Sequence, residues 1–418
     1  MIITVLPQNK ELRGLVEVPS DKSVSQRALI FSLLANNSFS VQNLSTSKDC
    51  LSTLEVVKQL GVNVKRQGNT FLLKNEVVGS SKPLFCGNSA TAMRLLCGVL
   101  SGKNFSSVLT GDESLSSRPM KRVVEPLTLM GAKIEGNVPM YIYPSVLHGI
   151  EYHSKISSGQ VKSAVLLAGV SAEGTTIYTE PHKSRNHTEL MLKYFGADIS
   201  VHGNTVRLNK SDLVAKDINV AGDFSSAAFL IAAALIVPNS DITIKNVGLN
   251  PTRIGFLNVL KDAGASIEVL NEKTFNLEPV GDIRVRYSEF KGFNLSGDII
   301  PNIIDELPLI AVLGCFAKGK TTVVDAKELR VKESDRISGI VSKLKSIGAK
   351  ISELEDGFVV EKSSLNGGVT LDCGFDHRIA LSLFVAGLGC KNAIKIKDFE
   401  CSDISFPNFV ETIKKVMS

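Results

Sequence analysis

The residues best suited to chemistry in this chain stand in short mixed-charge clusters. The sharpest is ELRVKESDR, which places Glu328, Arg330, Lys332, Glu333, Asp335 and Arg336 within nine positions. Such a cluster is usually a solvated loop. Here it lies between a β-branched run, TTVV, and an apolar segment with helical periodicity, which favours a functional site.

Two other segments offer complementary groups. Lys22, Ser23 and Arg27 lie within one turn or so of a helix start, so they offer an ammonium, a hydroxyl and a guanidinium. A lysine there is unfavourable unless an anion compensates the helix dipole; the plainer alternative is a solvated helix start. In IIDELP, Asp305 and Glu306 open a buried helix, where a carboxylate is stabilised and could act as a base.

Each of the remaining polar segments gives a weaker indication of a functional site. Arg118 precedes Pro119 and should be extended on a loop ahead of a helix, and FDHR could form one corner of a site. Capping, ion pairing or an ordinary surface position would explain each segment equally well. The residues concerned are Asn88, Ser89 and Arg94 in GNSATAMR, Arg118 in GDESLSSRPMKR, Ser157, Ser158, Gln160 and Lys162 in SSGQVKSA, Arg185 in SRNHTE, and Asp376, His377 and Arg378 in FDHR.

A repeated unit must position these groups. Six copies each run from a polar turn into an apolar helix, a β-branched strand, a polar loop and a second amphipathic helix, which is the pattern of a repeated supersecondary unit. Five second helices end in a glycine turn, at Gly61-Val62, Gly131-Ala132, Gly196-Ala197, Gly264-Ala265 and Gly348-Ala349. Each first helix begins with capping residues and is apolar on nearly every face, so we expect it to be buried. Six helix N-termini that converge would attract anions.

The length predicts two domains. The chain has 418 residues, which suits two domains of about 200 residues with three copies each. The sixth copy stops inside its helix, so we expect the N-terminal strand MIITVLP to complete the second domain. The predicted domains are therefore residues 14–222, and residues 1–13 together with 223–418, linked by two crossing segments.

Composition excludes several classes of protein. The net charge of +5 is spread along the chain, aromatic residues make up 6% and tryptophan is absent, so we expect no nucleic-acid partner. No signal peptide is visible, and the longest apolar run, residues 227–238, is too short to span a membrane.

Seven cysteines without a CxxC pair indicate free thiols in a reducing, cytoplasmic compartment. Neither nucleotide-binding glycine motif nor an HExxH motif occurs, and the chain is expected to be a monomer.

The motifs together resemble one enzyme family. PSDKSVSQRAL, GNSATAMRLL, GDESLSSRPM, SGQVKSAVLLAG, SRNHTE, GDFSSAAFLIAAAL, ELRVKESDRI and DHRIALS are similar, in order, to the motifs of 5-enolpyruvylshikimate-3-phosphate synthases. The resemblance implies an α/β (α+β) fold, a two-domain inside-out α/β barrel. Each domain would hold three βαβαββ units with buried helices and outer sheets, and the active site would lie in the interdomain cleft. It also implies transfer of the enolpyruvyl group of phosphoenolpyruvate to the 5-hydroxyl of shikimate 3-phosphate, with release of phosphate and without cofactor or metal.

The resemblance also implies roles for individual residues. Shikimate 3-phosphate would be held by Lys22, Ser23, Arg27, Ser158, Gln160, Arg185, Asp305 and Lys332. Phosphoenolpyruvate would be held by Lys22, Arg118, Gln160, Arg336 and Arg378, with Asn88, Ala90, Arg94 and His377 near the site. Asp305 would accept the hydroxyl proton, Glu333 would protonate the methylene carbon, and Lys22 would assist proton movement at the phosphate.

Four positions depart from the common family pattern. Ala90 stands where many members have glycine, and its methyl group would crowd glyphosate, which is longer than phosphoenolpyruvate. Gly159 replaces a common serine, Glu328 a common asparagine, and Ile404 a usual lysine, for which Lys397 is a possible substitute. We therefore expect a member of the glyphosate-tolerant branch.

Two alternatives compete with this interpretation. The related enolpyruvyl transferase that acts on UDP-N-acetylglucosamine shares the fold and donor, but it would carry a reactive cysteine in the loop GDESLSSRPMKR, which has none. A non-catalytic repeat scaffold that binds anionic metabolites would need no carboxylate base.

Overall fold

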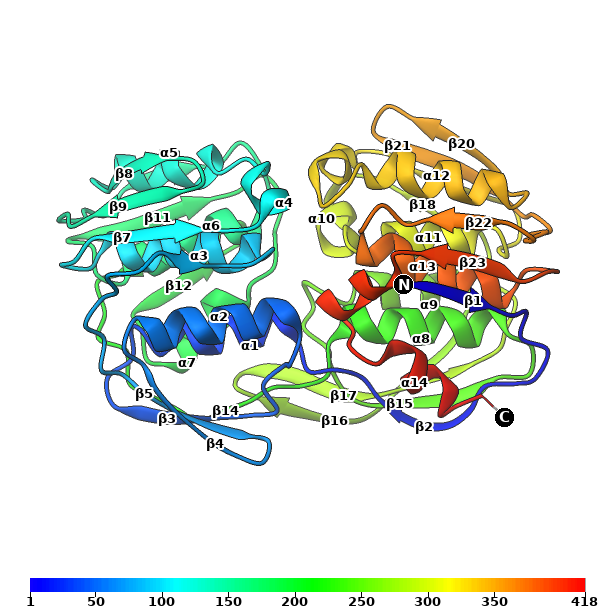
Figure 1. Cartoon of the computed structure of the whole chain (residues 1–418), viewed down its shortest axis with the longest axis horizontal. Coiled ribbons are helices and arrows are strands. Elements are labelled where there is room, and N and C mark those ends of the chain that lie inside the picture. Colours follow the sequence, from blue (N-terminus) through cyan, green and yellow to red (C-terminus); the bar gives the residue numbers. More distant parts are fainter. Residues whose placement is uncertain (418) are drawn as a thin grey trace. The chain divides into compact units, whose positions relative to one another are not determined.

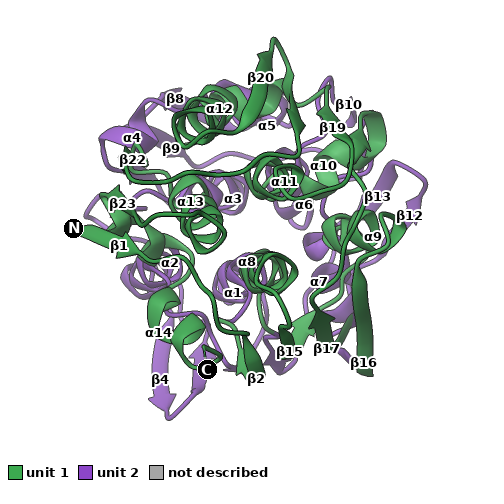
Figure 2. Cartoon of the chain, turned by 90° about the vertical axis from the view of Figure 1, so that its right-hand side faces the viewer, with its two compact units in different colours: residues 1–19, 222–273, 279–418 green, residues 20–221, 274–278 purple. Residues whose placement is uncertain are grey.

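The structure is a computed structural model that describes residues 1–417. The chain forms two compact units, which are coloured separately in Figure 2. Unit 1 comprises residues 1–19, 222–273 and 279 onward, and unit 2 comprises residues 20–221 and 274–278.

This division differs from the predicted boundaries at two places. Residues 14–19 belong to unit 1 because Arg13–Glu17 pairs with a strand of that unit. Residues 274–278 belong to unit 2 although they include the end of the strand Ser266–Phe275 and the first residue of the strand Glu278–Arg286, both paired in a sheet of unit 1. The chain therefore passes between the units four times, where the sequence predicted two crossings.

Unit 2 contains three four-stranded sheets of one design, in which two parallel strands are followed by two antiparallel ones. Their orders are β14–β3–β5–β4, β6–β7–β9–β8 and β10–β11–β13–β12. The strands are β3 (Ser38–Gln42), β4 (Asn63–Gln67), β5 (Thr70–Lys74), β6 (Leu84–Phe85), β7 (Ser107–Thr110), β8 (Lys133–Gly136), β9 (Met140–Tyr143), β10 (Glu151–His153), β11 (Thr175–Thr179), β12 (Ile199–His202), β13 (Thr205–Asn209) and β14 (Ile218–Asn219).

Helices alternate with these strands along the chain (Figure 1). They are α1 (Lys22–Phe31), α2 (Lys48–Gln59), α3 (Ala90–Ser101), α4 (Glu113–Ser116), α5 (Lys121–Leu129), α6 (Gly159–Gly169) and α7 (His187–Tyr194). The order confirms the predicted βαβαββ unit. In the first copy the leading strand is β14, which comes from the far end of the same unit and lies parallel to β3.

In the described part of unit 1, two sheets repeat this four-stranded design and the third has three strands. The sheets have the orders β16–β17–β15–β2, β18–β19–β21–β20 and β1–β23–β22. The strands are β1 (Ile2–Val5), β2 (Arg13–Glu17), β15 (Asp241–Gly248), β16 (Ser266–Phe275), β17 (Glu278–Arg286), β18 (Asn294–Leu295), β19 (Lys320–Val323), β20 (Lys350–Leu354), β21 (Gly357–Glu361), β22 (Thr370–Asp372) and β23 (Ile394–Lys397).

The helices of unit 1 follow the same alternation. They are α8 (Phe224–Ile236), α9 (Gly255–Asp262), α10 (Ile300–Ile303), α11 (Leu307–Gly314), α12 (Arg336–Ser346), α13 (His377–Leu388) and α14 (Phe409–Lys414), with 3-10 turns η1 (Gly297–Ile299), η2 (Lys327–Val331) and η3 (Phe399–Ile404). Strand β1 pairs antiparallel with β23, from Ile2 opposite Lys397 to Val5 opposite Ile394. The N-terminal strand thus completes the last sheet, as predicted.

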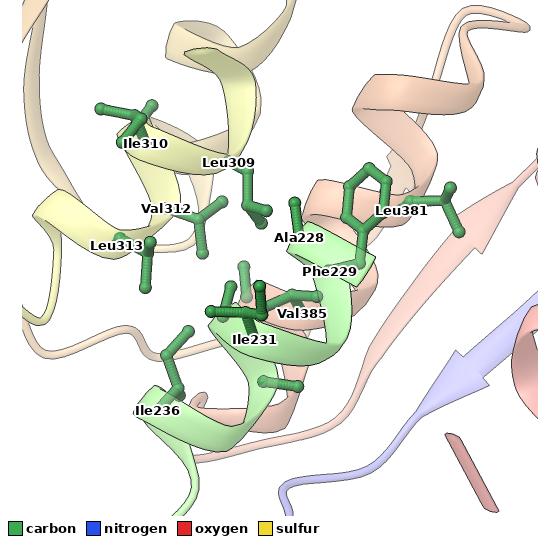
Figure 3. Packing of buried hydrophobic residues seen from close by; sticks show 14 of the residues in the cluster. Ala228, Phe229, Ile231, Ile236, Leu309, Ile310, Val312, Leu313, Leu381 and Val385 are labelled. Atoms are coloured by element: carbon green, nitrogen blue, oxygen red, sulfur yellow. The ribbon is translucent and has the colours of Figure 1, made fainter. Parts of the chain in front are cut away.

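The first helix of each copy is the buried one. All thirteen residues of α8 and all twelve of α13 are buried. Figure 3 shows Ile231 of α8 beside Val385 of α13, and Leu309 of α11 near Ala228 of α8. Figure 2 shows these helices in the middle of unit 1 with strands toward its outside. The helices are inside and the sheets outside, as expected, but the sheets remain separate and do not close into one barrel.

Side-chain caps begin five of the six buried helices. Asp21, Ser89, Ser158, Asp223 and Asp376 each accept a hydrogen bond from a backbone N–H in the first turn. The sixth, α11, begins at Glu306 without a side-chain cap and has Pro308 in its first turn. Because proline lacks an N–H, one donor of that turn needs no partner.

Candidate active site

In unit 2, polar contacts join the N-terminal turns of the three buried helices. Gln26 of α1 donates to Ser89, the cap of α3, at 2.7 Å. Arg94 of α3 donates to the side-chain oxygen of Gln160 in the first turn of α6. Arg27 of α1 donates to Ser163 of α6 at 3.0 Å, so the contacts run from α1 to α3 to α6 and back. The helix ends with their partial positive charges therefore gather at one place in this unit.

Arg27 is the most firmly held of the predicted cations. Its Nε donates to Thr188 Oγ1 at 2.7 Å, and its other nitrogens donate to the Ser23 carbonyl and to Ser163. Burial lowers the pKa of Arg27 to about 10; Glu189 opposes this, whereas the nearby Arg185 lowers it further. Two neighbouring guanidinium groups of this kind favour binding of an anion.

Lys22 is the first residue of α1, as predicted from the sequence, but its ion-pair partner was not predicted. Its Nζ lies 3.0 Å from Oδ2 of Asp49, in the first turn of α2. An acidic residue at a helix start is ordinarily interpreted as dipole stabilisation, so nothing in the sequence linked Asp49 to Lys22. Ser23 follows in the same turn and is half-buried.

The other predicted residues of unit 2 lie in the first two turns of the buried helices or on loops. Arg118 is on the loop after β7, and Arg185 is on the loop between β11 and α7. Asn88 accepts from Arg118 at 2.6 Å and donates to Asp112 at 2.8 Å, so the loop arginine is tied to the start of α3. Ala90 is the first residue of α3 and is almost buried, with 6% exposure.

In α6, Ser158 is the cap and Gln160 also donates to Thr91 at 2.8 Å. Gly159 is close to the backbone of Arg185, since an added Cβ would meet Cβ of that arginine at 3.3 Å. A serine, common here in the family that the sequence resembles, would therefore require Arg185 to shift slightly.

Lys162 is not a site residue in this geometry. Its ammonium lies 2.6 Å from Glu180 and 2.8 Å from Glu189, with 1% of the side chain exposed. Two carboxylates already neutralise it, so it has a structural role in fixing α6 to the segments after β11.

In unit 1, the charged segment after β19 gathers around Arg336, the first residue of α12. Its guanidinium donates to Asp376 at 2.9 Å, to Glu333 at 2.6 Å and to Asp305 at 3.3 Å. Burial alone would lower the pKa of Arg336, but these carboxylates raise it above its ordinary value. The predicted base and the predicted acid are thus held by the same guanidinium.

Lys332 belongs to the same cluster. Burial lowers its pKa below the ordinary value, while Asp305 and Glu328 raise it and Arg336 lowers it. Arg330, in contrast, donates to Asp335, Glu353 and the backbone of residues 354 and 355. It closes the loop onto β20, which is a structural role.

Arg378 and His377 begin α13. The Nη1 of Arg378 lies 3.4 Å from the Ser225 carbonyl of α8 and 3.9 Å from Glu306, and its guanidinium lies over the Phe229 ring at 5.8 Å. His377 has 2% exposure. Glu306 also accepts from Ser225 at 2.5 Å, so the starts of α8, α11 and α13 meet at these groups.

Sequence reasoning missed the supporting residues Asp49, Thr188, Ser163 and Arg253. Arg253, 3% exposed, donates to Ser225 at 2.6 Å and to the cap residue Asp223 at 3.4 Å. Its only sequence signal is a charged residue in the otherwise uncharged stretch VGLNPTRIGF. Within residues 1–417, no group of three or more His, Cys, Asp or Glu could hold a metal ion, and no helix is both long and apolar enough to cross a bilayer.

Comparison with known proteins agrees with this geometry. A family model described as EPSP synthase (3-phosphoshikimate 1-carboxyvinyltransferase) matches residues 6–413. The chain belongs to the EPSP synthase family. The family predicted from the motifs is therefore confirmed.

Curated relatives and solved structures of the family cover nearly all of the chain. It is 46% identical to the 3-phosphoshikimate 1-carboxyvinyltransferase of Thermoanaerobacter sp. (strain X514), over 96% of this chain and 97% of the relative. It is also 46% identical to that of Petrotoga mobilis, with both chains covered completely. A crystal structure of EPSP synthase from Acinetobacter baumannii superposes with a TM-score of 0.89 at 39% identity, covering 100% of this chain and 98% of the other.

Proposed function

We propose that this EPSP synthase family member transfers the enolpyruvyl group of phosphoenolpyruvate to the 5-hydroxyl of shikimate 3-phosphate. The observation that carries the proposal is the cluster around Arg336, where Asp305 and Glu333 are held on one guanidinium next to Lys332. An acid and a base fixed beside cations are what this reaction requires, because both substrates are anions and two protons must move.

The reaction proceeds by addition and elimination. The 5-hydroxyl oxygen attacks C2 of phosphoenolpyruvate and its proton passes to Asp305, while Glu333 delivers a proton to C3. The product of this step is a tetrahedral intermediate that still carries the phosphate. Glu333 then takes a proton back from C3 as the C2–O bond to phosphate breaks, and the departing phosphate takes up the proton held by Asp305. The enol ether and inorganic phosphate are released, and both carboxyl groups return to their starting states.

The cations of the chain divide between the two substrates. Shikimate 3-phosphate is bound by Lys22, Ser23, Arg27, Ser158, Gln160, Arg185, Asp305 and Lys332. Phosphoenolpyruvate is bound by Lys22, Arg118, Gln160, Arg336 and Arg378. In support of this division, Arg185 contributes to the lowered pKa of Arg27, an effect that a bound anion would offset. Burial likewise lowers the pKa of Lys332, and a bound phosphate would raise it again.

Four finer properties belong to the same proposal. The enzyme is tolerant to glyphosate, because the Ala90 methyl group stands at the buried start of α3, two residues after Asn88, which accepts a hydrogen bond from Arg118. It acts in the cytoplasm, which the seven free, buried cysteines support. It works as a monomer and without a cofactor.

The test is phosphate release from phosphoenolpyruvate, measured with and without shikimate 3-phosphate. We expect release only when both are present. A parallel reaction contains UDP-N-acetylglucosamine and no shikimate 3-phosphate. Turnover of UDP-N-acetylglucosamine, without turnover of shikimate 3-phosphate, would refute the proposal in favour of the related transferase. Release with neither acceptor would also contradict it.

A further inference from the structure

The β16–β17 hairpin ends in a turn that belongs to unit 2, although its strands lie in a sheet of unit 1. The two turn residues, Asn276 and Leu277, have φ of 50° and 70°. Two positive φ values suit the tight turn that joins twisted strands. Asparagine tolerates that conformation, whereas for leucine it is a strained one that persists only where the surroundings hold it.

Two contacts hold this turn. The Asn276 side chain accepts from the Asn219 N–H at 3.0 Å and donates to the Asn219 carbonyl at 2.7 Å. Glu278 places its two carboxylate oxygens 2.8 and 3.0 Å from Nδ1 of His187. The His187 side chain is 2% exposed and that of Glu278 is 14% exposed, so solvent screens this charge-assisted contact little.

His187 is the first residue of α7, and the first turn of this helix contacts the Arg27 side chain. The next residue, Thr188, accepts from Arg27 at 2.7 Å, and Glu189 then pairs with Lys162 at 2.8 Å. Arg185 lies two residues before His187. The N-cap residue of α7 makes no side-chain cap bond, and the Glu278 contact adds to the contacts of Thr188 and Glu189 that hold this first turn.

We propose that Glu278 is a positioning residue for shikimate 3-phosphate. Through His187 it fixes the first turn of α7, and that turn orients Arg27 and Arg185 toward the ligand. This inference rests on the proposed function of those two arginines. Its consequence is that affinity for shikimate 3-phosphate depends on Glu278, a residue of unit 2 that lies far along the chain from Arg27 and Arg185.

The test is the variant Glu278→Gln, which keeps the shape of the side chain and removes its charge. Binding of shikimate 3-phosphate alone is measured by titration calorimetry, and steady-state kinetics are measured with both substrates. Loss of a hydrogen bond to a charged group predicts binding weaker by about tenfold, with a matching rise in the KM for shikimate 3-phosphate. The KM for phosphoenolpyruvate and kcat should stay within about threefold, since Glu278 contacts neither reacting group. Glu272→Gln, an exposed position on the same hairpin, is the matched control and should change none of these values.

His187→Gln provides an independent variant of the same contact. It should weaken shikimate 3-phosphate binding as Glu278→Gln does, and the double variant should be no weaker than either single one, because both remove one interaction. Wild-type affinity in both single variants, equal loss for both substrates, or additive losses in the double variant would each overturn the inference. The proposed function is judged separately, by wild-type turnover of shikimate 3-phosphate.

Discussion

The Nε of Arg336 lies 2.9 Å from Oδ2 of Asp376, and the two side chains are 2% and 0% exposed. Asp376 also caps α13 by accepting from the N–H of Arg378 at 2.8 Å. One buried carboxylate thus orients an arginine of α12 and starts the helix that carries a second arginine.

We expect Asp376→Asn to weaken phosphoenolpyruvate binding. Asparagine still caps a helix, but Arg336 loses its nearest buried charge partner, which costs about 3 kcal/mol of folding free energy. The KM for phosphoenolpyruvate should rise about tenfold if that guanidinium turns away. Kinetics and the urea midpoint measure the two effects, with the exposed Asp262→Asn as control. An unchanged KM would show that Asp376 only caps α13 and does not orient Arg336 for binding.

Asp305→Asn should lower kcat by about 10²–10⁴-fold, because the amide cannot accept the hydroxyl proton. Glu333→Gln should lower kcat to a comparable extent, since it removes the proton donor to C3. Rapid-quench and steady-state phosphate release measure both, again with Asp262→Asn as control. A kcat within threefold of wild type in Asp305→Asn would remove this residue from the mechanism.

Ala90→Gly should make the enzyme more sensitive to glyphosate. Removing one methyl group from a tight pocket changes affinity by about 10–200-fold, and the glyphosate concentration that halves activity should fall accordingly. The KM for phosphoenolpyruvate, the shorter molecule, should change much less. Inhibition of the wild-type enzyme at low micromolar glyphosate would contradict both the prediction and the assignment to the tolerant branch.

Asp282 should stabilise the sheet that carries the β16–β17 hairpin in a pH-dependent way. It accepts from the N–H of Asn246 at 2.9 Å and from Asn271 at 2.7 Å, and it pairs with Lys245, where the register of β15 shifts against β17. Burial alone would raise the pKa of Asp282, but these contacts lower it below 3.8.

A depressed folded-state pKa contributes stability above the unfolded value, and this is lost as pH falls through the folded pKa. Asp282→Asn should therefore cost about 1–3 kcal/mol in urea unfolding at neutral pH. The difference from wild type should shrink only below about pH 4. A constant difference across that range would mean that the carboxylate charge is not what stabilises the bulge.

Cys373 and Cys401 should form a disulfide when the protein is oxidised. Their sulfur atoms lie 3.7 Å apart, and a disulfide requires about 2.05 Å. Diamide would take up two hydrogens as the two thiols join. The hydrogen bond from Cys401 lowers the pKa of Cys373 below 9.0. Oxidation should thus be faster near about pH 8 than near about pH 6, since the thiolate is the reactive form. Thiols counted in denaturant should fall by two from the seven of the chain, and Cys373→Ser should prevent this.

Much of the local structure could be predicted because local rules decide it. Ser89, Ser158 and Asp376 cap their helices, and short polar side chains just before an apolar run commonly act as N-caps. The sixth copy lacks a strand of its own, and this allowed the prediction that the N-terminal strand would complete its sheet.

The partners of the site cations could not be predicted, because they come from distant positions. Lys22 meets Asp49, Arg27 meets Thr188, and Arg336 meets Asp376. The periodicity of the sequence does not indicate which helix N-termini lie next to each other, because that depends on how the three copies of a unit pack together. The hairpin turn at Asn276 was missed for a related reason: a leucine follows the asparagine where glycine is the usual signal.

Strand pairing has a consequence for the order in which a growing chain can fold on the ribosome. Arg13 pairs with Asp241 and Ile2 with Lys397, so the first strands emerge long before their partners exist. Nearly all of unit 2 is synthesised in that interval, and its own last strand, β14, arrives at residue 219. The middle of the polypeptide can therefore acquire structure first, while the leading strands wait as an unpaired edge that a chaperone would need to shield.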